Sequence, residues 1–189
     1  GGFTTTMVTN TEAYDGTTWT NSPTLGTARY GLGGAGDSSG SALAFGGQNN
    51  SGTTYSLTEE FTKSINTITG AAWASGGNLN TGRYGLRGTG TQTAMVVAGG
   101  NVPPNSNTAV AEEYNGSSWT NTTSLPAVIQ DGNMTGTETA SIYAGGTINP
   151  GSYPGNTNAY NGSSWTSGGN MNTDVSQYGL TGTSTAAVA

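Results

Sequence analysis

The glutamates are the residues of this sequence most able to do acid–base chemistry. They recur before an aromatic residue, as Glu59-Glu60, as Glu112-Glu113 and, singly, as Glu12. A glycoside hydrolase needs two carboxylates at a defined separation and in different environments. Because these glutamates instead repeat at equivalent places, we expect Glu12, Glu59 and Glu112 to bond one repeat unit to the next, through Arg29, Arg83 or backbone amides, as buried charges usually do.

Composition restricts other catalytic chemistry. The 189-residue chain contains no His and no Cys, so it lacks the bases and thiols of the common nucleophile systems and the usual ligands of zinc and copper. We therefore expect a protein that is not an enzyme and that uses no metal and no cofactor. A glycan-active enzyme that relies on its carboxylates is the less favoured alternative.

The charge balance also excludes classes of partner. The net charge is −6 and only four residues are Lys or Arg, whereas nucleic-acid binding needs a basic footprint on the protein surface. No apolar run approaches the length of a membrane span. We expect neither a nucleic-acid partner nor membrane insertion.

Polar recognition is the chemistry that the remaining residues favour. Three variable stretches, "QNNSGTTYS", "NVPPNSNTA" and "TINPGSYPGN", follow a repeated double glycine. Asn, Ser, Tyr and Gly bind polar surfaces such as sugars through hydrogen bonds and ring stacking. The candidate ligand-binding residues are Arg29, Tyr30, Tyr55, Arg83, Tyr84 and Tyr153. The alternative is that these tyrosines pack against inner strands and the loops are soluble spacers.

The elements that must position these residues recur along the chain. Aromatic pairs and double glycines mark each unit, and tryptophans are 46 residues apart in the later units. The aromatic residues of the second pair are 12 positions apart and those of the other pairs are five apart, which indicates a seven-residue insertion. The repeated anchors are Tyr14 and Trp19, Phe61 and Trp73, Tyr114 and Trp119, Tyr160 and Trp165, with Gly46, Gly47, Gly99, Gly100, Gly145 and Gly146.

Each unit has the pattern of four short strands. In one unit we place them at about residues 82–90, 92–98, 108–114 and 117–122. Asn115-Gly116 predicts a two-residue hairpin turn of type I′, with positive φ at both positions. The flanking Tyr114 and Trp119 are then expected to pack between neighbouring sheets.

Four units of about 46 residues predict an all-β fold, a four-bladed β-propeller. It is expected to form a single domain over residues 1–189, with units at 1–27 plus 176–189, 28–80, 81–126 and 127–175. The chain opens with "GG" and closes with "TSTAAVA", an apolar run of the kind that precedes the double glycine elsewhere. We expect the N- and C-terminal strands to pair and close the ring, which removes exposed strand edges. An excerpt of a longer array, two copies forming an eight-bladed ring, and a β-sandwich are the alternatives.

The chain resembles kelch-repeat β-propellers. The matching elements are "FGG…TEEF…W", "AGG…AEEY…W" and "AGG…NAY…W", with "ARYG" and "GRYG" before the next unit. Two units depart from this pattern: one has "VIQDGN" in place of the Arg-Tyr-Gly stretch, and Gln177 precedes Tyr178 where Arg29 and Arg83 stand in the others.

The Thr/Gly-rich repeat style is similar to that of arrays in surface and virion proteins of marine phages and bacteria. These resemblances imply an extracellular or virion location, a glycan or surface protein as the ligand, and a homo-oligomer or a larger virion assembly. A structural spacer within a larger appendage is the alternative function.

Overall fold

The structure is a computed structural model that describes residues 1–63, 72–148 and 151–189, and within these ranges the regular structure is all strand. Most of the predicted seven-residue insertion falls at 64–71, outside the described residues. The described part contains no helix that is long and apolar enough to cross a membrane.

Three antiparallel sheets of four strands follow one another along the described chain. The first sheet has the order β5 (Gly33–Ser38), β6 (Ser41–Phe45), β7 (Thr58–Thr62), β8 (Ala72–Ser75). The second has β9 (Arg87–Thr91), β10 (Ala94–Ala98), β13 (Ala111–Tyr114), β14 (Trp119–Thr122). The third has β15 (Asn133–Thr137), β16 (Ala140–Ala144), β17 (Thr157–Tyr160), β18 (Trp165–Ser167).

Two-stranded sheets lie before and after these three. The N-terminal hairpin is β3 (Thr11–Tyr14) with β4 (Trp19–Ser22), and the C-terminal hairpin is β19 (Thr181–Thr183) with β20 (Ala186–Val188). Two further small pairs are β1 (Gly2–Phe3) with β2 (Met7–Val8), and β11 (Asn101–Val102) with β12 (Ser106–Asn107).

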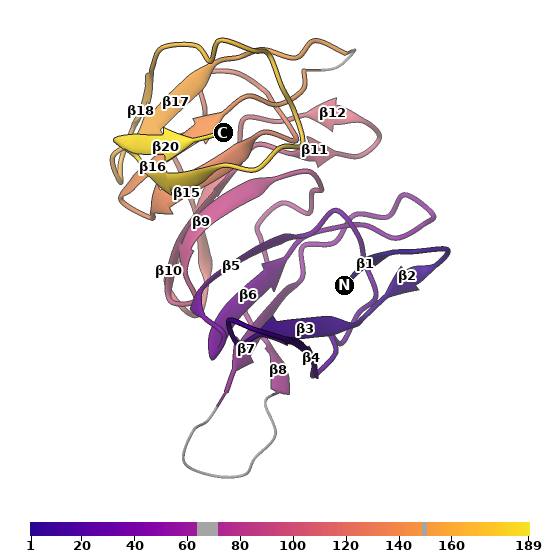
Figure 1. The fold of residues 1–189 in the computed structure, drawn as a ribbon. Coiled ribbons are helices and arrows are strands. Elements are labelled where there is room, and N and C mark those ends of the chain that lie inside the picture. The colour runs from indigo at the N-terminus through magenta and orange to yellow at the C-terminus, as the bar shows by residue number, and fades with distance from the viewer. Residues whose placement is uncertain (64–71, 149–150) are drawn as a thin grey trace.

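The first strands of successive sheets lie side by side, β5 against β9, β9 against β15 and β15 against β19 (Figure 1). These strands are rich in glycine because the neighbouring backbone leaves little room for side chains. At Gly90, φ is 133° and an added Cβ would lie 2.3 Å from the carbonyl oxygen of Ala94 in β10, the next strand of the same sheet. Glycine at this position therefore allows β9 and β10 to approach closely.

The hydrophobic core lies between the sheets. Successive side chains of β10 alternate between the two faces of its sheet, so this strand contributes to a cluster on each face. Val97 packs with Phe45 and Trp119 in the cluster toward the first sheet. Val96, its neighbour in sequence, packs with Tyr143 in the cluster toward the third sheet. Successive side chains of a strand point to opposite faces, so a strand covered on both faces is apolar throughout.

The predicted strand order is confirmed, but the turn between the last two strands of a unit differs from the prediction. Positive φ occurs at Gly116 and not at Asn115, and the loop spans residues 115–118. The Asn115 side-chain oxygen accepts hydrogen bonds from the backbone N–H groups of Ser117 and Ser118, both at 3.0 Å. The residue is selected for this side-chain cap, which stabilises a wider turn than type I′.

The predicted closure of the ring is not formed. Within the described residues β3 pairs only with β4 and β20 only with β19, and the two hairpins lie at opposite ends of the row of sheets (Figure 1). At the position equivalent to Arg83 the C-terminal side carries Val175, so pairing of the two ends would leave the carboxylate of Glu12 without the cation that Glu112 has.

The structure also changes one alignment between repeats. The second glycine of each pair donates its N–H to the carbonyl of Arg83, Ile129 or Val175. These three residues are therefore equivalent, and Gln177, which the sequence pattern placed opposite the arginines, is two positions further on. Its φ of 55° matches the φ of 65° at Gly85, the turn residue two positions after Arg83.

Candidate functional site

The linkers that lead into the three sheets run side by side and define one face of the molecule. Gly85 N–H donates to the carbonyl of Gly31, and Asp131 N–H donates to the carbonyl of Gly85. The residues just before these positions, Tyr30, Tyr84 and Gln130, therefore lie in a row. We call this surface, together with the loops that follow the double glycines, the loop face.

Each residue of this row is fixed to the loop of its own sheet. Isolated β-bridges join Tyr30 to Gln48, Tyr84 to Asn101 and Gln130 to Thr147. Gln48, Asn101 and Thr147 each follow a double glycine directly. The double glycine thus returns the chain toward the linker, and its positive φ values, such as 70° and 104° at Gly99 and Gly100, allow that reversal.

Polar side chains connect these positions across the loop face. Asn101 is fully buried and donates from Nδ2 to the Oδ1 atoms of Asn105 and Asn107, at 3.0 and 3.1 Å. Asn107 donates to the carbonyl of Thr147 at 2.7 Å, which links the second and third loops. Such a network holds amide groups in fixed directions before any ligand arrives.

The predicted tyrosines lie in three different settings. Tyr30 and Tyr84 are half-buried on the loop face, where Tyr30 accepts from Gln48 Nε2 at 3.0 Å. Burial raises the pKa of the Tyr84 phenol, and the charges of Asp131 and Tyr30 act in the same direction. Tyr55 is half-buried and Tyr153 is 52% exposed, each in the loop of its own sheet.

The side chains of the two arginines predicted to bind ligand do not reach the loop face. Arg29 and Arg83 are fully buried, and their ion pairs with Glu59 and Glu112 have nitrogen–oxygen distances of 2.5 and 3.1 Å. Desolvation by burial lowers the pKa of Arg83. The predicted pairing of Glu59 and Glu112 with the arginines is confirmed, but each pair joins a linker to the third strand of its own sheet and does not join two units. The guanidinium groups are not available to a ligand at the surface.

Sequence reasoning missed the amides of the loop face. Gln48 and Asn107 are half-buried and contribute more to its polar surface than the arginines do, and the buried Asn101 fixes Asn107 from below. The available signal was a Gln or Asn placed directly after the double glycine in two units, in "GGQ" and "GGN".

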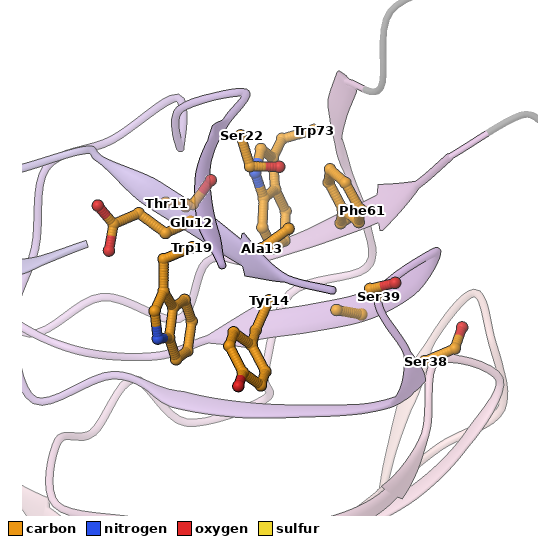
Figure 2. Close-up of a pocket in the computed structure, with 11 residues that line it drawn as sticks. Thr11, Glu12, Ala13, Tyr14, Trp19, Ser22, Ser38, Ser39, Phe61 and Trp73 are labelled. Atoms are coloured by element: carbon orange, nitrogen blue, oxygen red, sulfur yellow. The ribbon is translucent and has the colours of Figure 1, made fainter. Parts of the chain in front are cut away.

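A second candidate region is a pocket of about 290 Å³ beside the N-terminal hairpin. Its aromatic lining consists of Tyr14 and Trp19 on one side and Phe61 and Trp73 on the other (Figure 2). Trp73 Nε1 donates to the carbonyl of Pro23 at 2.8 Å, which joins the hairpin to the first sheet. The pocket lies along the free edge of β3, where the second and third sheets instead carry a hydrogen-bonded inner strand.

Comparison with known proteins bears on the fold. No protein-family model matches the chain, and no curated protein matches it. The chain is similar to a solved structure entitled "Structure of YjhT", with a TM-score of 0.71 and 12% sequence identity. The match covers 85% of this chain and 52% of that one, so this chain spans about half the length of the solved structure. The similarity supports an all-β fold built from several antiparallel sheets.

Proposed function

We propose that the chain is a non-enzymatic binding module, built from kelch-like propeller blades, whose loop face recognises carbohydrate. The observation that carries this proposal is the row of equivalent polar positions Tyr30–Gln48, Tyr84–Asn101 and Gln130–Thr147. Sugars are bound by such combinations of half-buried rings and fixed amides, since one sugar face is apolar and its edge is polar. A location outside the cell or on a virion appendage is part of this proposal.

The carboxylates support a binding role over an enzymatic one. Glu59 and Glu112 are buried, and each accepts a backbone N–H as well as pairing with an arginine. A carboxylate held in this way inside the protein does not reach a glycosidic bond. The loop face provides rings and amides instead of a pair of accessible acids.

The test is a glycan-array screen with the folded chain presented multivalently, because single-site affinities for sugars are weak. We expect a narrow set of sugars to bind, with binding lost in Tyr84→Ala and reduced in Asn107→Ala. Tyr14→Ala, which removes an exposed ring at the N-terminal hairpin, is the matched control and should bind normally. Equal loss in Tyr14→Ala, or no sugar bound by protein that is folded, would count against the loop face.

A structural spacer is the second candidate function, and a specific observation favours it. Both terminal hairpins present unpaired strand edges within the described residues, and edges of this kind pair with other strands unless they are protected. Absence of a saturable ligand, together with assembly through these edges, is the result that this alternative predicts.

A further inference from the structure

The N-terminal hairpin has the side chains of an interior strand pair but lacks their cover. Tyr14 lies opposite Trp19 in the same register as Tyr114 opposite Trp119. Tyr14 and Trp19 are 47% and 67% exposed, whereas Tyr114 and Trp119 are 0% and 6% exposed. Large aromatic rings left open side by side on one hairpin mark an interaction surface.

The boundaries between sheets show what covers such a pair. Tyr114 OH donates to Glu60 of the preceding sheet, and Tyr160 OH donates to Glu113 at 2.6 Å. Where Phe61 takes the place of the tyrosine, the preceding strand has Ala13 instead of a glutamate. A phenol at this position therefore goes with a carboxylate on the preceding sheet, and a phenyl ring goes with alanine.

A second set of residues changes together in the linkers. In the second sheet Glu112 takes an ion pair from Arg83 and a hydrogen bond from the N–H of Asn80 at 2.7 Å. In the third sheet Asn158 replaces the glutamate and Ile129 replaces the arginine. Pro126, which has no N–H, replaces Asn80. A glutamate at this strand position thus accompanies a buried arginine, and it is absent where the arginine is absent.

We propose that the N-terminal hairpin is the docking site for a β-hairpin of another repeat that brings both an arginine and a glutamate. The hairpin carries Glu12 and Tyr14, the combination that the second sheet satisfies with Arg83 and Glu60. The incoming hairpin adds to the free edge of β3 along the pocket in Figure 2 and covers the rings of Tyr14 and Trp19. Its preceding linker places the arginine against Glu12, and the sheet before it places the glutamate against Tyr14.

The chain's own C-terminal side does not meet these requirements. Val175 occupies the arginine position, and Ala159 occupies the position of Glu60 and Glu113. Asn172 keeps an N–H for Glu12, but no cation accompanies it. A second copy of this chain offers the same mismatch, so the partner is a repeat other than those of residues 1–189.

The first test converts the C-terminal side into a matching partner. The full chain with Val175→Arg and Ala159→Glu is compared with wild type by light scattering over a concentration series and by quenching of exposed tryptophan. We expect the wild type to remain at 18.9 kDa. The variant should pair its ends within or between molecules, with Trp19 shielded and association on the order of 100-fold tighter. Adding Glu12→Gln and Tyr14→Phe to the same variant should reverse both effects.

The reciprocal exchange keeps the proposal testable if that variant fails to fold. Glu12→Asn gives the N-terminal hairpin the amide that Asn158 provides beside Ile129, and Tyr14→Phe gives it the phenyl ring that Phe61 provides beside Ala13. This double variant should therefore accept the unmodified C-terminal hairpin, which carries Val175 and Ala159. Tyr14→Phe alone is the control and should stay open. Wild type that associates through its hairpins as tightly as either exchanged variant overturns the proposal. So do exchanged variants that are folded by circular dichroism yet keep Trp19 exposed.

Discussion

Replacing the buried arginine of the second sheet should destabilise the protein, and a second substitution should rescue it. Arg83 and Glu112 are both fully buried, so Arg83→Ile leaves a carboxylate in the core with only the N–H of Asn80 as a partner. Removing one member of a buried ion pair costs about 3–5 kcal/mol of unfolding free energy. Among the residues that the structure describes, no group forms an aligned hydrogen bond with a guanidinium nitrogen of Arg83, so the arginine itself contributes little beyond its charge.

The third sheet supplies the rescuing residues. Because Ile129 and Asn158 occupy the equivalent positions there, the double variant Arg83→Ile/Glu112→Asn should unfold within about 1–2 kcal/mol of wild type. Urea denaturation followed by circular dichroism gives the four free energies of the double-mutant cycle, and the expected coupling is about 2 kcal/mol or more. Additive losses, or a single variant as stable as the double one, would refute the account of matched pairs.

Three further outcomes follow from individual contacts. Burial and the hydrogen bond to Glu60 raise the pKa of Tyr114 to about 12, and burial and Glu113 do the same for Tyr160. The folded state therefore holds these protons longer than the unfolded state, so alkaline titration should show stability falling as pH rises from about 10 to 12, with a smaller fall in Tyr160→Phe. The backbone N–H groups of Thr18 and Thr17 lower the pKa of Asp15 to about 2, so NMR should show the turn of the N-terminal hairpin loosening as pH falls from about 4 toward 2. Asp15→Asn, the residue type found at 115 and 161, should remove that pH dependence. Gly77→Ala would place a Cβ 2.3 Å from the carbonyl oxygen of Ser117, so thermal unfolding should show a loss of about 1–3 kcal/mol. Gly169→Ala, with no atom within 4 Å of the added Cβ, should stay within about 0.5 kcal/mol of wild type.

The repeat spacing was sufficient to predict the strand order, because a unit that recurs with its aromatics and glycines in place must recur in structure. The strand boundaries were less predictable: β9 begins at Arg87, several residues after the expected start, because the linker before it forms an isolated bridge at Tyr84 and hydrogen bonds to neighbouring linkers in place of a continuous ladder. The amide-capped turn at Asn115 could not be distinguished from a type I′ turn, since both favour Asn-Gly.

The candidate site was harder to predict than the fold. Exposure depends on where a linker runs, so Arg83 and Tyr84, adjacent in sequence, were assigned one role although the arginine is buried and the tyrosine lies on the loop face. Ring closure was inferred from the phase of the repeats alone. Comparing Glu12 with Val175 requires the three-dimensional equivalence of residues in different units, because the linear pattern placed Gln177, two positions further on, opposite the arginines.

NMR titration of the isotope-labelled chain with the best sugar from the array shows where on the surface the sugar binds. Binding at the loop face should change the chemical shifts of the side-chain amides of Gln48, Asn101 and Asn107, and leave those of Asp15 and Trp19 unchanged. Shift changes confined to the pocket beside Tyr14 and Trp19, with the loop face unaffected, would contradict carbohydrate recognition by the loop face.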